Sequence, residues 1–102
     1  MHERDIETLR EAAAEFLSRE AGRQSLVTVT RAELSDDRKR GTVYLSVYPE
    51  SAEVGAVQFA NRHRAEFGTY FEKRVRGMRI PHVEFVIDLG EKNRRRLDEL
   101  SN

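Results

Sequence analysis

The spacing of apolar positions divides the chain into segments with helical and strand-like periods. Residues 5–22 carry apolar side chains at intervals of three and four residues, which predicts an amphipathic helix. Gly22 suits the position just past the helix end, where a left-handed backbone is common. The apolar positions of this helix are Ile6, Leu9, Ala13, Phe16 and Leu17.

Two strand-like runs follow, at residues 25–34 and 41–49. Both runs alternate apolar and polar side chains and are rich in β-branched residues, with Val43, Leu45 and Val47 on one face. A short polar connector joins the two runs. They therefore predict an antiparallel hairpin with one covered face.

The region after the hairpin has a helical period again. Pro49 ends the second strand, Ser51 suits the N-cap of the next helix, and Glu53 falls in its first turn. The helical run is too long for one ordinary helix and contains Gly68, so we predict a kink or break near residues 64–68. Its apolar positions are Ala56, Ala60, Phe67, Phe71, Val75 and Met78.

Residues 81–89 alternate once more and predict a third strand, ended by Gly90. Its apolar face carries Val83, Phe85 and Ile87, while Glu84 and Asp88 are expected on the polar face, toward water or arginines. For the remaining polar tail, the pattern leaves open one or two helical turns or no fixed structure.

The order of these elements is α-β-β-α-α-β. It predicts a two-layer α+β sandwich in which a kinked central helix covers a three-stranded sheet. The 102 residues suit one domain with a modest core. We expect this domain to span residues 1–90 and a basic C-terminal tail to span residues 91–102.

Composition narrows the class of protein. The chain is 38% hydrophobic and 35% charged, which indicates a small core and a charge-dense surface. It has no cysteine, which excludes disulfides and cysteine-ligated metals. No apolar run approaches the ~20 residues that span a bilayer, and the N-terminus lacks the apolar core of a secretory signal. We therefore expect a cytoplasmic protein without a membrane partner.

Charge is balanced in total and uneven in distribution. Eighteen basic residues oppose eighteen acidic ones, and only three of the basic residues are lysine. Residues 62–79 carry six basic side chains and two acidic ones, a local charge of +4. Arginine forks suit phosphate oxygens, so this segment predicts an RNA-phosphate surface. Its residues are Arg62, Arg64, Lys73, Arg74, Arg76 and Arg79.

The hairpin connector is charged as well. It carries Asp36, Asp37, Arg38, Lys39 and Arg40 in succession. The aspartates are adjacent, so they favour local turn formation over paired acid and base catalysis. The basic residues leave two readings open, a solvated turn or one edge of a binding surface.

Motifs for catalysis and cofactor binding are missing. His2, His63 and His82 are the only histidines, and none pairs with another at three- or four-residue spacing. The chain has no nucleophile elbow, no glycine-rich phosphate loop and no dinucleotide fingerprint. We expect no catalytic residue, no metal, no cofactor and no small-molecule substrate.

The element order is that of the type II KH domain, although the GXXG loop of that RNA-binding fold is missing. Two stretches resemble ribosome-binding factor A, a family with this order and without that loop. The first is VTVTRAELSDDRKRGTVYLSV (residues 27–47), with a Glu-Leu-Ser-x-Asp turn at residues 33–37. The second is FEKRVRGMRIPHVEFVID (residues 71–88). Gap-free alignment from Pro81 places residues 63–65 at the family's helix kink and Gly68 where a basic residue is usual.

The resemblance implies a bacterial, non-catalytic factor that binds the immature small (30S) ribosomal subunit through its rRNA. Members assist maturation of the 16S rRNA ends and growth in the cold. On this reading, Arg38, Lys39 and Arg40 join the RNA-binding surface, and the protein acts as a monomer. The alternative is a protein-interaction module that uses an exposed sheet edge or charged face, and a small enzyme is a third reading.

Overall fold

The computed structural model describes residues 3–20 and 25–101 of the chain. His2 and Gly22 lie outside the described residues, and so does the role predicted for Gly22 at the end of the first helix. The elements are α1 (Glu3–Glu20), β1 (Leu26–Leu34), β2 (Arg40–Tyr48), the 3₁₀ helix η1 (Glu50–Ala52), α2 (Glu53–Arg62), α3 (Arg64–Arg74), β3 (His82–Ile87) and α4 (Leu89–Ser101).

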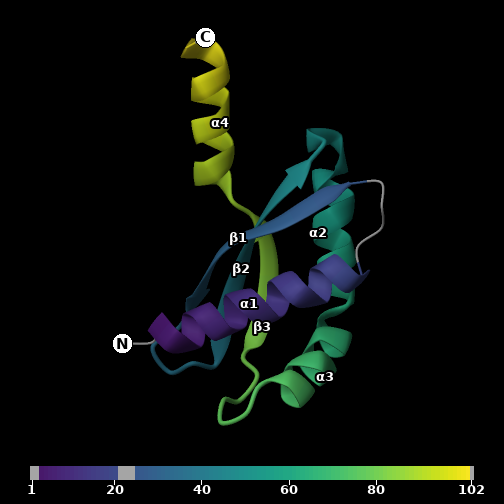
Figure 1. Cartoon of the computed structure of the whole chain (residues 1–102), viewed down its shortest axis with the longest axis vertical. Helices are drawn as coiled ribbons and strands as arrows, with labels where there is room; N and C mark the ends of the chain where they lie inside the picture. Colours follow the sequence, from purple (N-terminus) through teal and green to yellow (C-terminus); the bar gives the residue numbers. More distant parts are fainter. Residues whose placement is uncertain (1–2, 21–24, 102) are drawn as a thin grey trace.

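The three strands form one sheet in the order β1-β2-β3. β1 and β2 are antiparallel, as predicted, with Leu26 opposite Tyr48. β2 and β3 are parallel, with Arg40 opposite His82. Parallel neighbours need a crossover connection, which α2 and α3 supply. Figure 1 shows α1 crossing the sheet and α4 projecting beyond it.

One face of the sheet is buried against α1, α2 and α3. Phe67 of α3 lies near the centre of this core, with its ring centroid 5.4 Å from Phe16 and 5.9 Å from both Phe71 and Phe85. All four rings belong to one hydrophobic cluster that includes the inward residues of every strand. The molecule is 16 Å thick along its shortest axis, which fits the predicted two-layer sandwich.

The hairpin connector forms a tight turn. The Asp37 carboxylate accepts hydrogen bonds from the Ser35 hydroxyl (2.7 Å) and the Lys39 amide (3.0 Å). Arg38 adopts a left-handed backbone, with φ of 62°. The prediction that the aspartates form the turn is thus confirmed for Asp37.

β1 contains a bulge that is visible in its apolar pattern. The pairing register shifts between Val29 and Arg31. Val29 and Ala32 are both buried, and two residues lie between them where regular alternation allows one. The bulge keeps both flanking apolar segments on the core face. It also lets the Thr30 hydroxyl donate a hydrogen bond to the Asp88 carboxylate, at 2.6 Å.

The start of α2 differs from the prediction. Ser51 is not its N-cap, because the chain turns after Pro49 into η1 and Ser51 is already inside that helical turn. Ala52 occupies the N-cap position and makes no side-chain hydrogen bond. Glu53 lies in the first turn, as predicted.

The central helical region breaks at His63, near residues 64–68 as predicted and within residues 63–65, where the family alignment placed the kink. The imidazole Nδ1 of His63 lies 2.8 Å from the Phe59 carbonyl oxygen, and the two rings stack at 4.1 Å. This contact closes the end of α2. Gly68 lies inside α3, where an added Cβ would meet nothing within 4 Å, so the glycine does not cause the break.

The end of β3 also departs from the prediction. Val83 and Phe85 are buried and Glu84 is exposed, as predicted. Asp88 contacts an arginine, as predicted, with Arg31 Nε 3.5 Å from its carboxylate, but the residue is only 4% exposed. It accepts a hydrogen bond from the Glu91 amide (3.0 Å), the geometry of a helix N-cap. The polar tail consequently starts a 13-residue helix at Leu89, and Gly90 is its second residue, not the strand end.

Candidate nucleic-acid interface

The β1–β2 turn and the α3–β3 loop meet at one end of the sheet. The His82 amide donates a hydrogen bond to the Lys39 carbonyl, at 2.8 Å. Figure 1 shows the hairpin turn and the α3–β3 loop at the end of the molecule opposite α4. The fold thus brings the charged connector near the basic segment that follows α3.

Apolar anchors orient the arginines of the α3–β3 loop. Val75, Met78 and Ile80 are partly buried against the core, whereas Arg76 and Arg79 between them are exposed. Gly77, with φ of +80°, provides the turn that this alternation requires. We call the exposed cations at this end the end surface: Lys39, Arg40, Lys73, Arg76 and Arg79.

Arg74 belongs to the same segment and is engaged differently. Its guanidinium donates two hydrogen bonds to the Glu15 carboxylate of α1, one of them from Nη2 at 2.7 Å. The Tyr70 hydroxyl donates a further bond to Glu15, at 2.7 Å. The Arg74 and Tyr70 hydrogen bonds lower the pKa of Glu15 to about 2, and the Glu15 bond raises the pKa of Arg74. Arg74 therefore joins α3 to α1 in the free protein.

Arg38 is likewise in contact with a carboxylate. Its Nη1 lies 3.1 Å from the Asp5 carboxylate of α1. Both side chains remain partly exposed, so this is an ion pair that solvent screens. Of the three basic residues in the connector, Arg38 thus contacts α1 while Lys39 and Arg40 belong to the end surface.

Arg62 and Arg64 lie at a second place. They flank His63 at the α2–α3 junction and border a shallow depression together with Asn61. Arg64 of this junction and Lys73 of the end surface lie near opposite ends of α3, a rise of roughly 14 Å apart. Seven of the nine predicted residues thus form two exposed groups rather than one patch, and the other two, Arg38 and Arg74, are paired to α1.

Asn61 and Arg31 make contacts at the sheet that were not predicted from the sequence. The Asn61 side chain donates to the Phe85 carbonyl and accepts from the Phe85 amide, both at 3.0 Å. It therefore covers the outer edge of β3 at its middle. On the open face, the Arg31 guanidinium lies 3.7 Å from the Tyr44 ring centroid. No local sequence pattern signalled either contact.

Two further observations limit the chemistry of the described residues. Within residues 3–20 and 25–101, no three histidine or carboxylate side chains converge to hold a metal ion. No helix in the same ranges has both the length and the apolar character needed to cross a membrane.

Comparison with known proteins identifies the family. The family model of ribosome-binding factor A matches residues 2–101. The chain belongs to the ribosome-binding factor A family. The ribosome-binding factor A of Fervidobacterium nodosum is 32% identical over 68 residues, which cover 66% of this chain and 54% of that protein. The one from Pseudothermotoga lettingae is 30% identical over 97 residues, which cover 94% of this chain and 77% of that protein. The chain thus spans about half the length of the first relative.

Known structures of ribosome-binding factor A share the fold. The crystal structure from Thermus thermophilus has a TM-score of 0.71 and 29% identity, and the match covers 80% of this chain and 90% of that one. A Thermus thermophilus homology model, fitted into a cryo-EM map of a 30S complex, has a TM-score of 0.69, 29% identity and coverage of 79% and 88%. A Thermotoga maritima NMR structure has a TM-score of 0.68, 26% identity and coverage of 81% and 82%. The predicted α+β, KH-like fold is confirmed.

Proposed function

We propose that this protein binds the small (30S) ribosomal subunit by non-catalytic contacts to rRNA. The observation that carries the proposal is membership in the ribosome-binding factor A family, together with the Thermus thermophilus relative that was fitted into a 30S complex. The likeness to that relative covers 79% of this chain, so the region shared with the relative includes most of the domain.

The end surface supplies the main RNA contacts in this proposal. Its five cations come from the hairpin turn, the end of α3 and the α3–β3 loop, and all five are exposed. Arg62 and Arg64 add a second contact point at the α2–α3 junction. A rigid arrangement of separated guanidinium groups suits the spaced phosphates of folded RNA better than one dense patch. Arg38 and Arg74 contribute only if phosphates replace Asp5 and Glu15.

The biological role that we propose is assistance in 30S assembly and in maturation of the 16S rRNA ends, including during growth in the cold. The support is the family relationship and the positively charged, exposed character of the end surface. In this role the protein binds precursor rRNA and holds it in a conformation that processing enzymes recognise, and it needs no cofactor. It is proposed to act as a monomer.

A complementation experiment tests this role. Cells of the host that lack the protein should accumulate 16S rRNA with unprocessed ends and grow slowly in the cold, and the wild-type chain should reverse both effects. The triple variant K73Q/R76Q/R79Q should fail to reverse them, because it removes three exposed cations of the end surface without touching the core.

The control for that experiment is Arg10→Gln, which removes a cation that α1 pairs with its own Glu7. It should complement as well as the wild type. Full complementation by the triple variant would move the RNA contacts elsewhere, and normal rRNA ends in cells without the protein would contradict the processing role.

The alternative of a protein-interaction module that uses the sheet edge receives less support. Asn61 already occupies the backbone groups of Phe85 at the middle of the β3 edge, and β1 at the other edge is bulged. Bulges and covered edges disfavour strand addition.

A further inference from the structure

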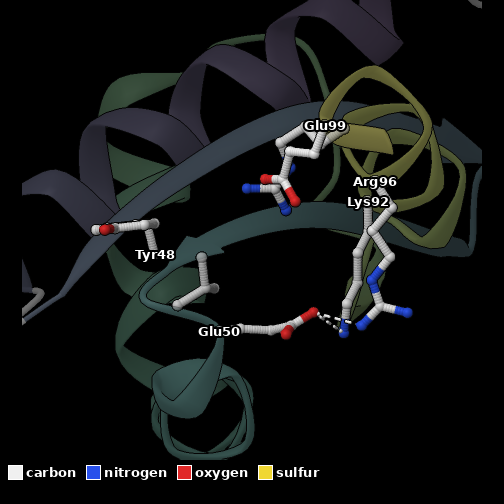
Figure 2. A pocket seen from close by; sticks show the side chains of 7 residues that line it. Tyr48, Glu50, Lys92, Arg96 and Glu99 are labelled. Atoms are coloured by element: carbon white, nitrogen blue, oxygen red, sulfur yellow. Dashed lines mark hydrogen bonds and ion pairs between the residues drawn. The ribbon is translucent and has the colours of Figure 1, made fainter. Parts of the chain in front are cut away.

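Helix α4 is attached to the rest of the molecule by polar contacts at its first two turns. Asp88 caps its first turn and is held by Thr30 of β1. Lys92 and Arg96, one turn apart, reach from α4 toward Glu50 of η1 (Figure 2). Beyond these contacts α4 projects away from the sheet (Figure 1). The contacts with Glu50 therefore help to fix the direction in which α4 points.

A single carboxylate oxygen makes both of those contacts. Glu50 Oε1 lies 2.9 Å from Lys92 Nζ and 2.7 Å from Arg96 Nη2. Lys92 has a second partner in Glu53, also at 2.9 Å. The Lys92 and Arg96 hydrogen bonds lower the pKa of Glu50, so this carboxylate stays ionised at neutral pH. One acidic side chain therefore contacts two of the four basic side chains of α4.

The two ion pairs differ in burial. In the Lys92–Glu53 pair the side chains are 17% and 13% exposed, whereas in the Arg96–Glu50 pair they are 58% and 55% exposed. Exposed pairs are screened and contribute little to stability, so they exchange partners readily. A small cavity of about 140 Å³ between Glu50, Tyr48 and α4 leaves the Arg96 side chain loosely packed (Figure 2).

We propose that Glu50 is an intramolecular competitor of RNA phosphate, which masks Arg96 of α4 in the free protein and releases it when rRNA is bound. Lys92 and Glu53 keep α4 attached during the exchange. Arg95 is already paired with Glu91 at 3.1 Å, so the released Arg96 side chain would itself supply a second basic contact, at the end of the molecule opposite the end surface. This inference rests on the proposed function, since the competing phosphates are those of rRNA.

The experiment measures the affinity for a 16S rRNA transcript at several salt concentrations, by fluorescence anisotropy, for the wild type, Glu50→Gln and Glu84→Gln. Glu84 is an exposed carboxylate in the middle of β3, so its variant makes the same change in net charge without releasing α4. Glu50→Gln should bind more tightly than Glu84→Gln at low salt, because no ion pair has to open before Arg96 reaches a phosphate. The advantage should shrink as salt rises, since salt screens the exposed Glu50–Arg96 pair that the Glu84→Gln protein retains.

The double variant E50Q/R96Q identifies the released group. Its salt slope should be shallower than that of Glu84→Gln by about 0.7–0.9, the value for one lost phosphate contact. Equal affinities of Glu50→Gln and Glu84→Gln at low salt would overturn the inference and leave the proposed function intact, as would a double variant that keeps the slope of Glu84→Gln. A wild-type protein that binds no rRNA would instead overturn the proposed function, and this inference with it.

Discussion

At the scale of single residues, some charged side chains of this protein join its helices, and others are exposed to solvent. Arg74 belongs to a basic segment that predicts RNA contact, yet the structure pairs it with Glu15 across two helices. Arg76, two residues later, has an exposed side chain in the loop. Local sequence could not separate the two, because the partner of Arg74 lies 59 positions away.

The Glu15–Arg74 contact makes stability depend on pH. The pKa of Glu15 is about 2 in the folded protein, below the value of ~4.3 for a glutamate in an unfolded chain. Its stabilising contribution is therefore complete above pH ~4.3 and is lost as the pH falls through 2. Urea unfolding should show the wild type more stable than Glu15→Gln at pH 7, with the difference shrinking between pH 4.5 and 2. A difference that stays constant over this range would contradict the assignment.

At the scale of elements, periodicity predicted the three strands, the first helix and a broken central helix, but it left α4 open as one or two turns or no fixed structure. All three strands and the antiparallel hairpin follow from alternation, and the slip from Val29 to Ala32 marks the β1 bulge. The break at His63 depends on a ring contact with Phe59, which spacing does not reveal. Alternation assigned Asp88 to the polar face of β3. Its burial could not be predicted, because its hydrogen-bond partner Thr30 lies on a strand 58 positions away.

The cap on α4 gives the element-scale prediction. Burial alone would raise the pKa of Asp88, but the Thr30 hydroxyl, the Glu91 amide and Arg31 hold it below its ordinary value. Asp88→Ala should therefore remove a charged cap and lower the stability of α4 by about 1 kcal/mol, seen as faster amide exchange within residues 89–101. Asp88→Asn keeps a capping oxygen and should retain most of the protection. Unchanged exchange in the alanine variant would show that the cap does not hold the helix.

At the scale of the whole molecule, the net charge is zero, but acidic and basic side chains are unevenly distributed over the elements. α1 carries six acidic and three basic residues, whereas the end surface gathers five exposed cations, with Asp36 and Asp37 of the hairpin turn beside them. The candidate RNA-binding residues could be predicted from local charge as a set, but not their division into an end surface, a junction pair and two side chains paired to α1. That division depends on tertiary contacts such as the one between His82 and Lys39.

The central claim is that the end surface binds the small ribosomal subunit. Cosedimentation of the purified protein with small subunits, large subunits and free rRNA, at low and moderate salt, tests it most directly. We predict selective pelleting with small subunits that weakens as salt rises, because phosphate contacts release counterions. Equal pelleting with all three would show that the surface binds phosphate without specificity for the small subunit. No pelleting with small subunits would contradict the claim.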